Sequence, residues 1–207
     1  MLKRTKGRLL ITLLVVTGLA GTFNNNSISQ QERKYAVSLL KDSRSNLLDE
    51  VKELSGKQLN YKSPSAQVSV KNCVTQAALI EQKLWQMINA VMEQPANPEK
   101  RSEIKLTDEK LVAMAENGSI TSLSANTFKQ ANSPWKTFNE ATISFKTMRS
   151  DHIKYMKSST EDLRNHVVLT PAGWLDCYQF ILLISASTNH CAHMIEDVKS
   201  DQYFPKK

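Results

Sequence analysis

Glycine and proline are scarce in this chain of 207 residues, with six of each, whereas 41% of its residues are hydrophobic. This balance excludes a low-complexity or disordered chain and is typical of a packed globular protein. Runs that alternate apolar and polar residues with the period of a strand are lacking, and no segment repeats. The apolar residues instead recur with helical spacing. The sequence therefore predicts one all-α domain.

The N-terminal apolar run is too short for a membrane-spanning helix, which needs roughly 20 residues. It covers residues 9–23 and is followed closely by no cysteine, which argues against a lipid-modified N-terminus. Gly18 and Ala20 have the spacing of a signal-peptidase site. Basic residues precede the run: Lys3, Arg4, Lys6 and Arg8. We therefore predict a signal peptide over 1–24, a mature domain over 25–207, and export to the periplasm or the exterior. The alternative is an uncleaved membrane anchor over residues 9–23.

Clustered positive charge is also lacking once this segment is removed. The formal net charge of +7 includes its four cations, which leaves +3 for residues 25–207. The remaining Lys and Arg are scattered among acids, without the interleaved aromatics of a nucleic-acid surface. We therefore expect no nucleic-acid partner. Cysteine is limited to Cys73, Cys177 and Cys191, an odd number in an oxidising compartment, so at least one is unpaired in a monomer.

Helical spacing and capping residues predict four long helices. The first covers about 29–54, with Gly56 as its stop signal, and the second begins after the cap Ser69 and ends before Pro95. The third begins with a capping box at Thr137 and Glu140. A short helix is expected over 107–118 with Gly118 past its end, and another over 158–166. Residues 94–103 and 119–134 have the composition of loops.

The fourth long helix is the most apolar part of the mature chain. We expect it to begin near Pro171, with Thr170 as its N-cap. Residues 180–184 are apolar without a break, which predicts a helix buried on every side. Asp176, one turn from this predicted start, is interpreted as a complement to the helix dipole rather than as a general base. Together these elements predict an antiparallel four-helix bundle with short accessory helices.

Three stretches resemble the DinB-like (DinB/YfiT) superfamily of four-helix metal-binding proteins. Residues 39–81 contain LSGKQL, a short turn and a following helix, and residues 145–167 are similar to the family's third helix and its sequel. Residues 174–205 are similar to the last helix, with its closing DQYFP. The resemblance implies a DinB/YfiT-type bundle in which three histidines hold a divalent metal, such as nickel or zinc. Characterised members include thiol-dependent transferases and isomerases.

The three metal-binding histidines are missing from this chain. The corresponding positions are Gln76, Ser187 and Cys191. His190 and His193 are close in sequence, but they lie about 100° and 200° around the helix from Cys191, so we expect neither to replace a ligand. The expectation is therefore a degenerate metal site and no cofactor. The alternative is a divalent metal, such as nickel or zinc, held in a non-standard way.

Cys73 lies one turn from Gln76, and the resemblance implies that both face Ser187 and Cys191. Three interpretations stay open. In the first the site is vestigial, Gln76 and Ser187 satisfy each other's hydrogen bonds, and the cysteines are small core residues. In the second a disulfide joins Cys73 and Cys191. In the third Cys191 belongs to a thiolate-ligated metal site or is a reactive nucleophile.

The function expected from these observations is that of an exported, non-catalytic DinB-like protein. It would bind a small apolar or thiol-bearing ligand in the old site or act as an interaction protein, and a homodimer formed through a helix face is compatible with such a bundle. Membrane contact is expected only if the N-terminal segment stays uncleaved. The alternative is a metal- or thiol-dependent transferase or hydrolase built around Cys191.

Overall fold

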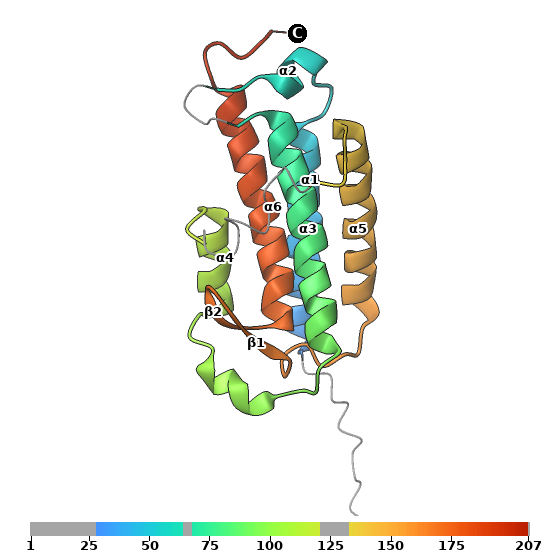
Figure 1. Cartoon of the computed structure of the whole chain (residues 1–207), viewed down its shortest axis with the longest axis vertical. Helices are drawn as coiled ribbons and strands as arrows, with labels where there is room; N and C mark the ends of the chain where they lie inside the picture. Colours follow the sequence, from blue (N-terminus) through green and yellow to red (C-terminus); the bar gives the residue numbers. More distant parts are fainter. Residues whose placement is uncertain (1–27, 64–67, 121–132, 207) are drawn as a thin grey trace, which may run out of the picture.

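A computed structural model describes residues 28–63, 68–120 and 133–206, and this part of the chain is predominantly helical (Figure 1). The prediction of an all-α fold is confirmed. The predicted signal peptide lies outside the described residues, as does most of the loop predicted over 119–134. Four long helices lie side by side: α1 (Gln30–Glu50), α3 (Val70–Met92), α5 (Phe138–Ser158) and α6 (Cys177–Lys199).

Short elements join the long helices. They are α2 (Gly56–Asn60), the 3-10 helix η1 (Pro98–Glu103), α4 (Asp108–Glu116), and the strands β1 (Val167–Thr170) and β2 (Gly173–Asp176). The predicted caps of the second and third long helices and of the 107–118 helix are confirmed: the hydroxyls of Ser69, Thr107 and Thr137 each accept a hydrogen bond from the first turn that follows. Side-chain oxygens that satisfy free amide groups therefore set these helix starts.

The start of the fourth long helix was predicted wrongly. Thr170 is the last residue of β1 and Pro171 follows in the turn of an antiparallel hairpin, in which Thr170 Oγ1 donates to the Gly173 carbonyl at 2.7 Å. Gly173 has a φ of +107°, which favours glycine. Helix α6 begins only at Cys177, because Asp176 forms a capping box with Gln179. The interpretation of Asp176 as a structural residue at the helix start agrees with this place.

Three further boundaries differ from the sequence prediction. Gly56 does not stop a helix but opens α2, whose cap is Ser55, and α1 already ends at Glu50. No helix covers 158–166, because α5 runs on through Ser158 and the chain then leads into β1. The predicted loop over 94–103 contains η1. All three lie at connections, where tertiary contacts outweigh local signals.

The long helices are not all antiparallel to their neighbours. The Tyr178 hydroxyl donates to the Glu32 carbonyl at one end of the bundle, and Lys199 pairs with Glu50 at the other, so α1 and α6 are parallel. Helices α3 and α5 are likewise parallel, whereas α1 is antiparallel to α5 and α3 to α6 (Figure 1). The long connection from α3 to α5, which carries η1 and α4, allows this order.

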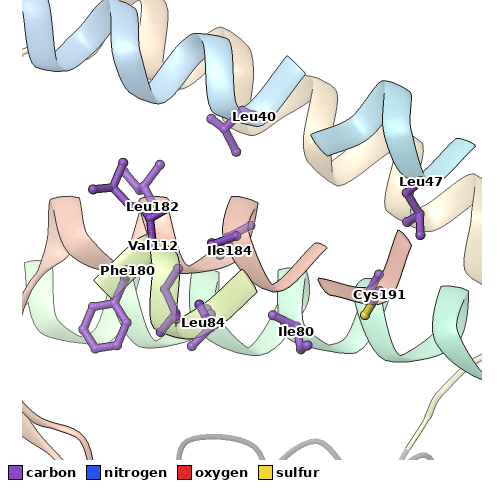
Figure 2. Close-up of a cluster of buried hydrophobic side chains, with 14 of the residues drawn as sticks. Leu40, Leu47, Ile80, Leu84, Val112, Phe180, Leu182, Ile184 and Cys191 are labelled. Atoms are coloured by element: carbon purple, nitrogen blue, oxygen red, sulfur yellow. The ribbon is translucent and has the colours of Figure 1, made fainter. Parts of the chain in front are cut away.

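Helix α6 forms the centre of the core and packs against α1, α3 and α4. Its residues 180–184 are between 0 and 2% exposed, which confirms the prediction of a helix buried on every side. Figure 2 shows Phe180, Leu182 and Ile184 of this helix among Leu40 of α1 and Leu84 of α3. Within the described residues, no helix combines the length and hydrophobicity needed to cross a membrane.

A buried ion pair joins all four long helices. Arg149 of α5 is fully buried, and its Nη2 lies 2.6 Å from Glu81 Oε2 of α3. The same guanidinium donates to the Leu40 carbonyl and Ser43 Oγ of α1, and to Thr188 Oγ1 of α6. Each polar atom at this point therefore has a partner in an otherwise apolar interior.

His152 completes this buried cluster. Its Nδ1 lies 2.6 Å from Glu81 Oε1, and its ring stacks on Trp85 with 3.7 Å between the ring centroids. Burial alone would raise the pKa of Glu81, but the charge of Arg149 and the hydrogen bonds from His152 and Arg149 outweigh it, so the pKa is lowered. No sequence pattern identified Glu81 or Arg149 as a buried ion pair, because their contact joins two helices that are far apart in the chain.

Replacing Arg149 alone is expected to destabilise the fold strongly. Arg149→Met leaves the buried Glu81 carboxylate without its guanidinium and with only the His152 imidazole as a partner, which costs about 3–5 kcal/mol in the free energy of unfolding. The double variant Glu81→Leu, Arg149→Met is expected to recover at least half of that loss. Folding lowers the pKa of Glu81. The stabilisation that the ionised Glu81 carboxylate gives the folded state is therefore present above a pH of about 4.3 and is lost as the pH falls.

Urea denaturation at pH 7 measures these differences, with Lys154→Met as the control on the exposed face of the same helix. A loss for Arg149→Met as small as that of the control would contradict the assignment of this cluster.

Candidate functional site

A cavity of about 250 Å³ lies between the first half of α3, the second half of α6 and the residues that follow α4. The four residues identified from the sequence all line it: Cys73 and Gln76 from α3, and Ser187 and Cys191 from α6. Both cysteines are 1% exposed, whereas Gln76 and Ser187 are half-buried. The structure therefore brings together the positions that the family resemblance indicated.

Helical spacing explains why these side chains share one space. On α3, Cys73, Gln76 and Ile80 are three and four residues apart and lie on one face. On α6, Ser187 and Cys191 have the same relation, and Figure 2 shows the Cys191 thiol directed from α6 towards α3. Because α3 and α6 are antiparallel, the start of one faces the end of the other. The cavity forms where these two faces meet.

His190 also lines the cavity, although it lies about 100° around the helix from Cys191. The cavity extends beyond the face of α6 that carries Ser187 and Cys191, because residues 115–120 form a third wall. His190 Nδ1 lies 3.0 Å from the Glu116 carbonyl, and Nε2 has no hydrogen-bond partner within the described part of the chain. His193 is exposed, as its position on the helix predicted.

Gly118 fits closely against this histidine. Its φ of +73° is the left-handed conformation that favours glycine. A Cβ atom at this position would lie 2.7 Å from Cε1 of His190 and 3.1 Å from Nε2. The end of α4 can approach α6 this closely only because residue 118 has no side chain. Glycine here therefore determines both the helix end and the shape of the cavity wall.

The two cavity cysteines are buried, free thiols. Burial raises the pKa of Cys73 to about 12. Burial, with a further contribution from nearby Cys73, raises the pKa of Cys191 well above its ordinary range. Both thiols are therefore protonated at neutral pH, and the structure contains no Cys73–Cys191 disulfide. Cys177 is a third buried free thiol at the start of α6, and it does not line the cavity.

The hydrogen bond expected between Gln76 and Ser187 in the vestigial interpretation does not form. Neither side chain is hydrogen-bonded to any described residue, although both line the cavity. The amide of Gln76 offers two donors and an acceptor, and the hydroxyl of Ser187 offers a donor and an acceptor. The site thus presents unused hydrogen-bonding groups in a mainly apolar wall.

The donor set does not fit the metal that the family resemblance implies. That site needs three imidazoles, whereas this cavity offers one imidazole, two protonated thiols, two amides and a hydroxyl. Across the described residues, no group of three or more His, Cys, Asp or Glu side chains is placed to hold a metal ion. We therefore derive no chemical step through a metal.

A second polar cluster lies at the opposite end of α6, away from the cavity. Arg164 pairs with Glu32, Asp108 and Asp176, which ties α1, α4 and the start of α6 together. Burial raises the pKa of Asp176 to about 6, although Arg164 acts against this rise. Since Asp176 also caps α6, its role is structural. Arg164 was not predicted from the sequence, because no local sequence pattern indicates that one arginine pairs with three acids from different parts of the chain.

We expect the two cavity cysteines to react slowly with alkylating reagents. With a pKa of about 12, only about one Cys73 in ten thousand is a thiolate at pH 8. Iodoacetamide at pH 8 is therefore expected to label the folded protein at least about a hundred times more slowly than the protein in urea. Peptide mass spectrometry identifies the labelled residues. Rapid labelling of Cys191 in the folded protein would instead favour the thiol-dependent alternative.

Comparison of the chain with protein-family models, with curated proteins and with solved structures gives no match. The DinB-like assignment therefore rests on the sequence motifs alone. The function has to be argued from the geometry of the cavity and from the chemistry of the residues that line it.

Proposed function

We propose that this chain is an exported protein with a DinB-like four-helix bundle whose altered site binds a small neutral molecule and does not catalyse a reaction on it. The observation that carries the proposal is that Gln76 and Ser187 line a formed cavity and have no hydrogen-bond partner among the described residues. A site that had merely decayed would be expected to fill with apolar side chains or to satisfy its own polar groups.

The lining defines the chemistry of the ligand. Its described residues include no Asp, Glu, Lys or Arg, so a charged ligand would lose its hydration without a counter-charge. The apolar part of the wall includes Ile80, Ile120 and Met194, and the polar part includes Asn72 and His190. A volume of about 250 Å³ is smaller than most drug-sized sites. These properties favour a compact neutral ligand, such as a single ring that carries an amide or a hydroxyl group.

The enzymatic alternative is less well supported. A nucleophilic cysteine is normally an accessible thiolate activated by a base or a positive charge, whereas Cys191 is 1% exposed and its pKa is raised. His190, the one imidazole in the lining, is held by the Glu116 carbonyl. Recognition of a ligand needs only the hydrogen-bonding groups that the cavity already presents.

Benzamide and benzoate test the proposal as a matched pair of equal size. Benzamide is expected to bind with a dissociation constant below about 1 mM, whereas benzoate is expected to bind at least tenfold more weakly because its charge has no partner. Ligand-observed NMR measures both. Gln76→Leu should weaken benzamide binding by about tenfold through the loss of a hydrogen bond, and should leave toluene binding nearly unchanged.

Ser187→Met is expected to abolish benzamide binding, because the larger side chain fills the cavity. The control is Ser150→Met, the same change at an exposed position of α5. Equal binding of benzamide by the two variants would place the ligand elsewhere and refute the proposal for this cavity.

Metal content distinguishes the proposed binding protein from the metalloenzyme alternative. Residues 25–207, purified without chelator or histidine tag, are expected to retain less than about a tenth of an equivalent of nickel, zinc, manganese or iron, since three imidazoles are missing. Elemental mass spectrometry measures this content. Close to one equivalent, lost in Cys191→Ala, would support a thiolate-containing metal site instead.

A further inference from the structure

A groove rich in positive charge runs along the outer face of α1. Its first part, of about 370 Å³, is lined by Arg33, Lys34, Val37, Ser38, Lys41 and, from the end of α5, Lys157. A second hollow of about 430 Å³ shares Lys41 and continues past Arg44 to Asp49. We call these two hollows together the α1 groove. It is separate from the cavity between α3 and α6.

The α1 groove gathers cations that no neighbouring acid among the described residues neutralises, and it is this clustering, not the lack of ion pairs, that sets them apart from other surface cations. Within the described residues, Lys34, Lys41, Arg44 and Lys157 form no salt bridge, whereas Lys199, Arg149 and Arg164 each pair with an acid. Arg33 donates to a backbone carbonyl, that of Met156 at 2.8 Å. Of the nearby acids, Asp42 accepts from Ser38 Oγ, and Asp49 lies at the far end of the groove. The first hollow has no acidic residue in its lining.

We propose that the α1 groove docks on the anionic phospholipid headgroups of a membrane surface. The groove is open and elongated, and Lys34, Lys41 and Lys157 are exposed, which suits a field of phosphates better than one enclosed small anion. The described residues that line the two hollows include no aromatic side chain on which the bases of a nucleic acid could stack.

The position of the groove in the chain gives the second argument for a membrane. The apolar run over residues 9–23 is separated from the start of α1 at Gln30 by six residues, which reach at most about 20 Å. Arg33 and Lys34 are the fourth and fifth residues of that helix. A chain that enters or crosses a membrane through this run therefore presents the groove next to the headgroups.

Vesicle binding tests the proposal with residues 25–207, the predicted mature domain, which includes every residue of the described buried core. Vesicles with about 30 mol% phosphatidylglycerol in phosphatidylcholine are expected to bind at least tenfold more protein than pure phosphatidylcholine vesicles at about 50 mM salt. Binding should be largely lost at about 500 mM salt, because the interaction is screened. Cosedimentation measures the partition coefficient.

Two matched double variants distinguish the effect of the groove cations on vesicle binding from the effect of net charge. Lys34→Gln with Lys41→Gln is expected to lower the partition coefficient about 25-fold, at about fivefold for each cation. Lys110→Gln with Lys136→Gln removes the same charge from exposed positions outside the groove and should lower it by less than about threefold. Circular dichroism checks that both variants are folded. Equal losses in the two variants, or no preference for phosphatidylglycerol, would overturn the proposal.

Inorganic phosphate distinguishes a membrane surface from a free anion. Calorimetry is expected to detect no saturable binding of phosphate below about 1 mM. Tight binding of phosphate that disappears in the Lys34, Lys41 variant, without binding to vesicles, would assign the groove to a soluble anion and refute docking on a membrane.

Discussion

The buried pair of Arg149 and Glu81 is the interaction on which the arrangement of the four long helices depends. Each of its hydrogen bonds comes from a different part of the bundle: α3 supplies the carboxylate, α1 a carbonyl and a hydroxyl, and α6 the hydroxyl of Thr188. Losing one of these partners would cost a buried guanidinium roughly several kcal/mol, because water is excluded from a packed interior and cannot replace the lost hydrogen bond. A helix that slid or rotated would break this set, so we interpret the cluster as the element that specifies helix register.

The register set by this cluster also determines the cavity. Thr188 is the neighbour of Ser187, and Glu81 lies on α3 five residues after Gln76. The hydrogen bond of Thr188 to Arg149 therefore fixes the rotation of α6 that turns Ser187 and Cys191 towards α3. At the other end of α6, the cluster of Arg164 and its three acids holds the helix start. Between these two fixed points the apolar part of α6 needs only close packing.

Charge is distributed in the molecule according to burial. The buried cations Arg149 and Arg164 are paired, and the described lining of the cavity is free of charged residues. The unpaired cations of the α1 groove lie on the surface, where water solvates them at little cost. The interior cavity is thus suited to neutral molecules and the outer groove to anions. The two sites place different chemical demands on the same bundle and share no residue.

The family resemblance indicated which residues share the cavity. The sequence by itself determined the helical content, several of the helix starts, the burial of residues 180–184 and the residues that lie on one face of each helix. These follow from local rules, since a hydroxyl caps the next turn and residues three or four apart share a face. The tertiary structure alone decided the partners of Arg149, Glu81 and Arg164, the parallel pairing of α1 with α6, and the place of His190 against Gly118. These depend on residues up to 149 positions apart, such as Lys199 and Glu50. It also decided between the two start signals of α6, because Thr170 and Pro171 suit a hairpin turn as well as a helix start, and only the pairing of β1 with β2 selects the turn.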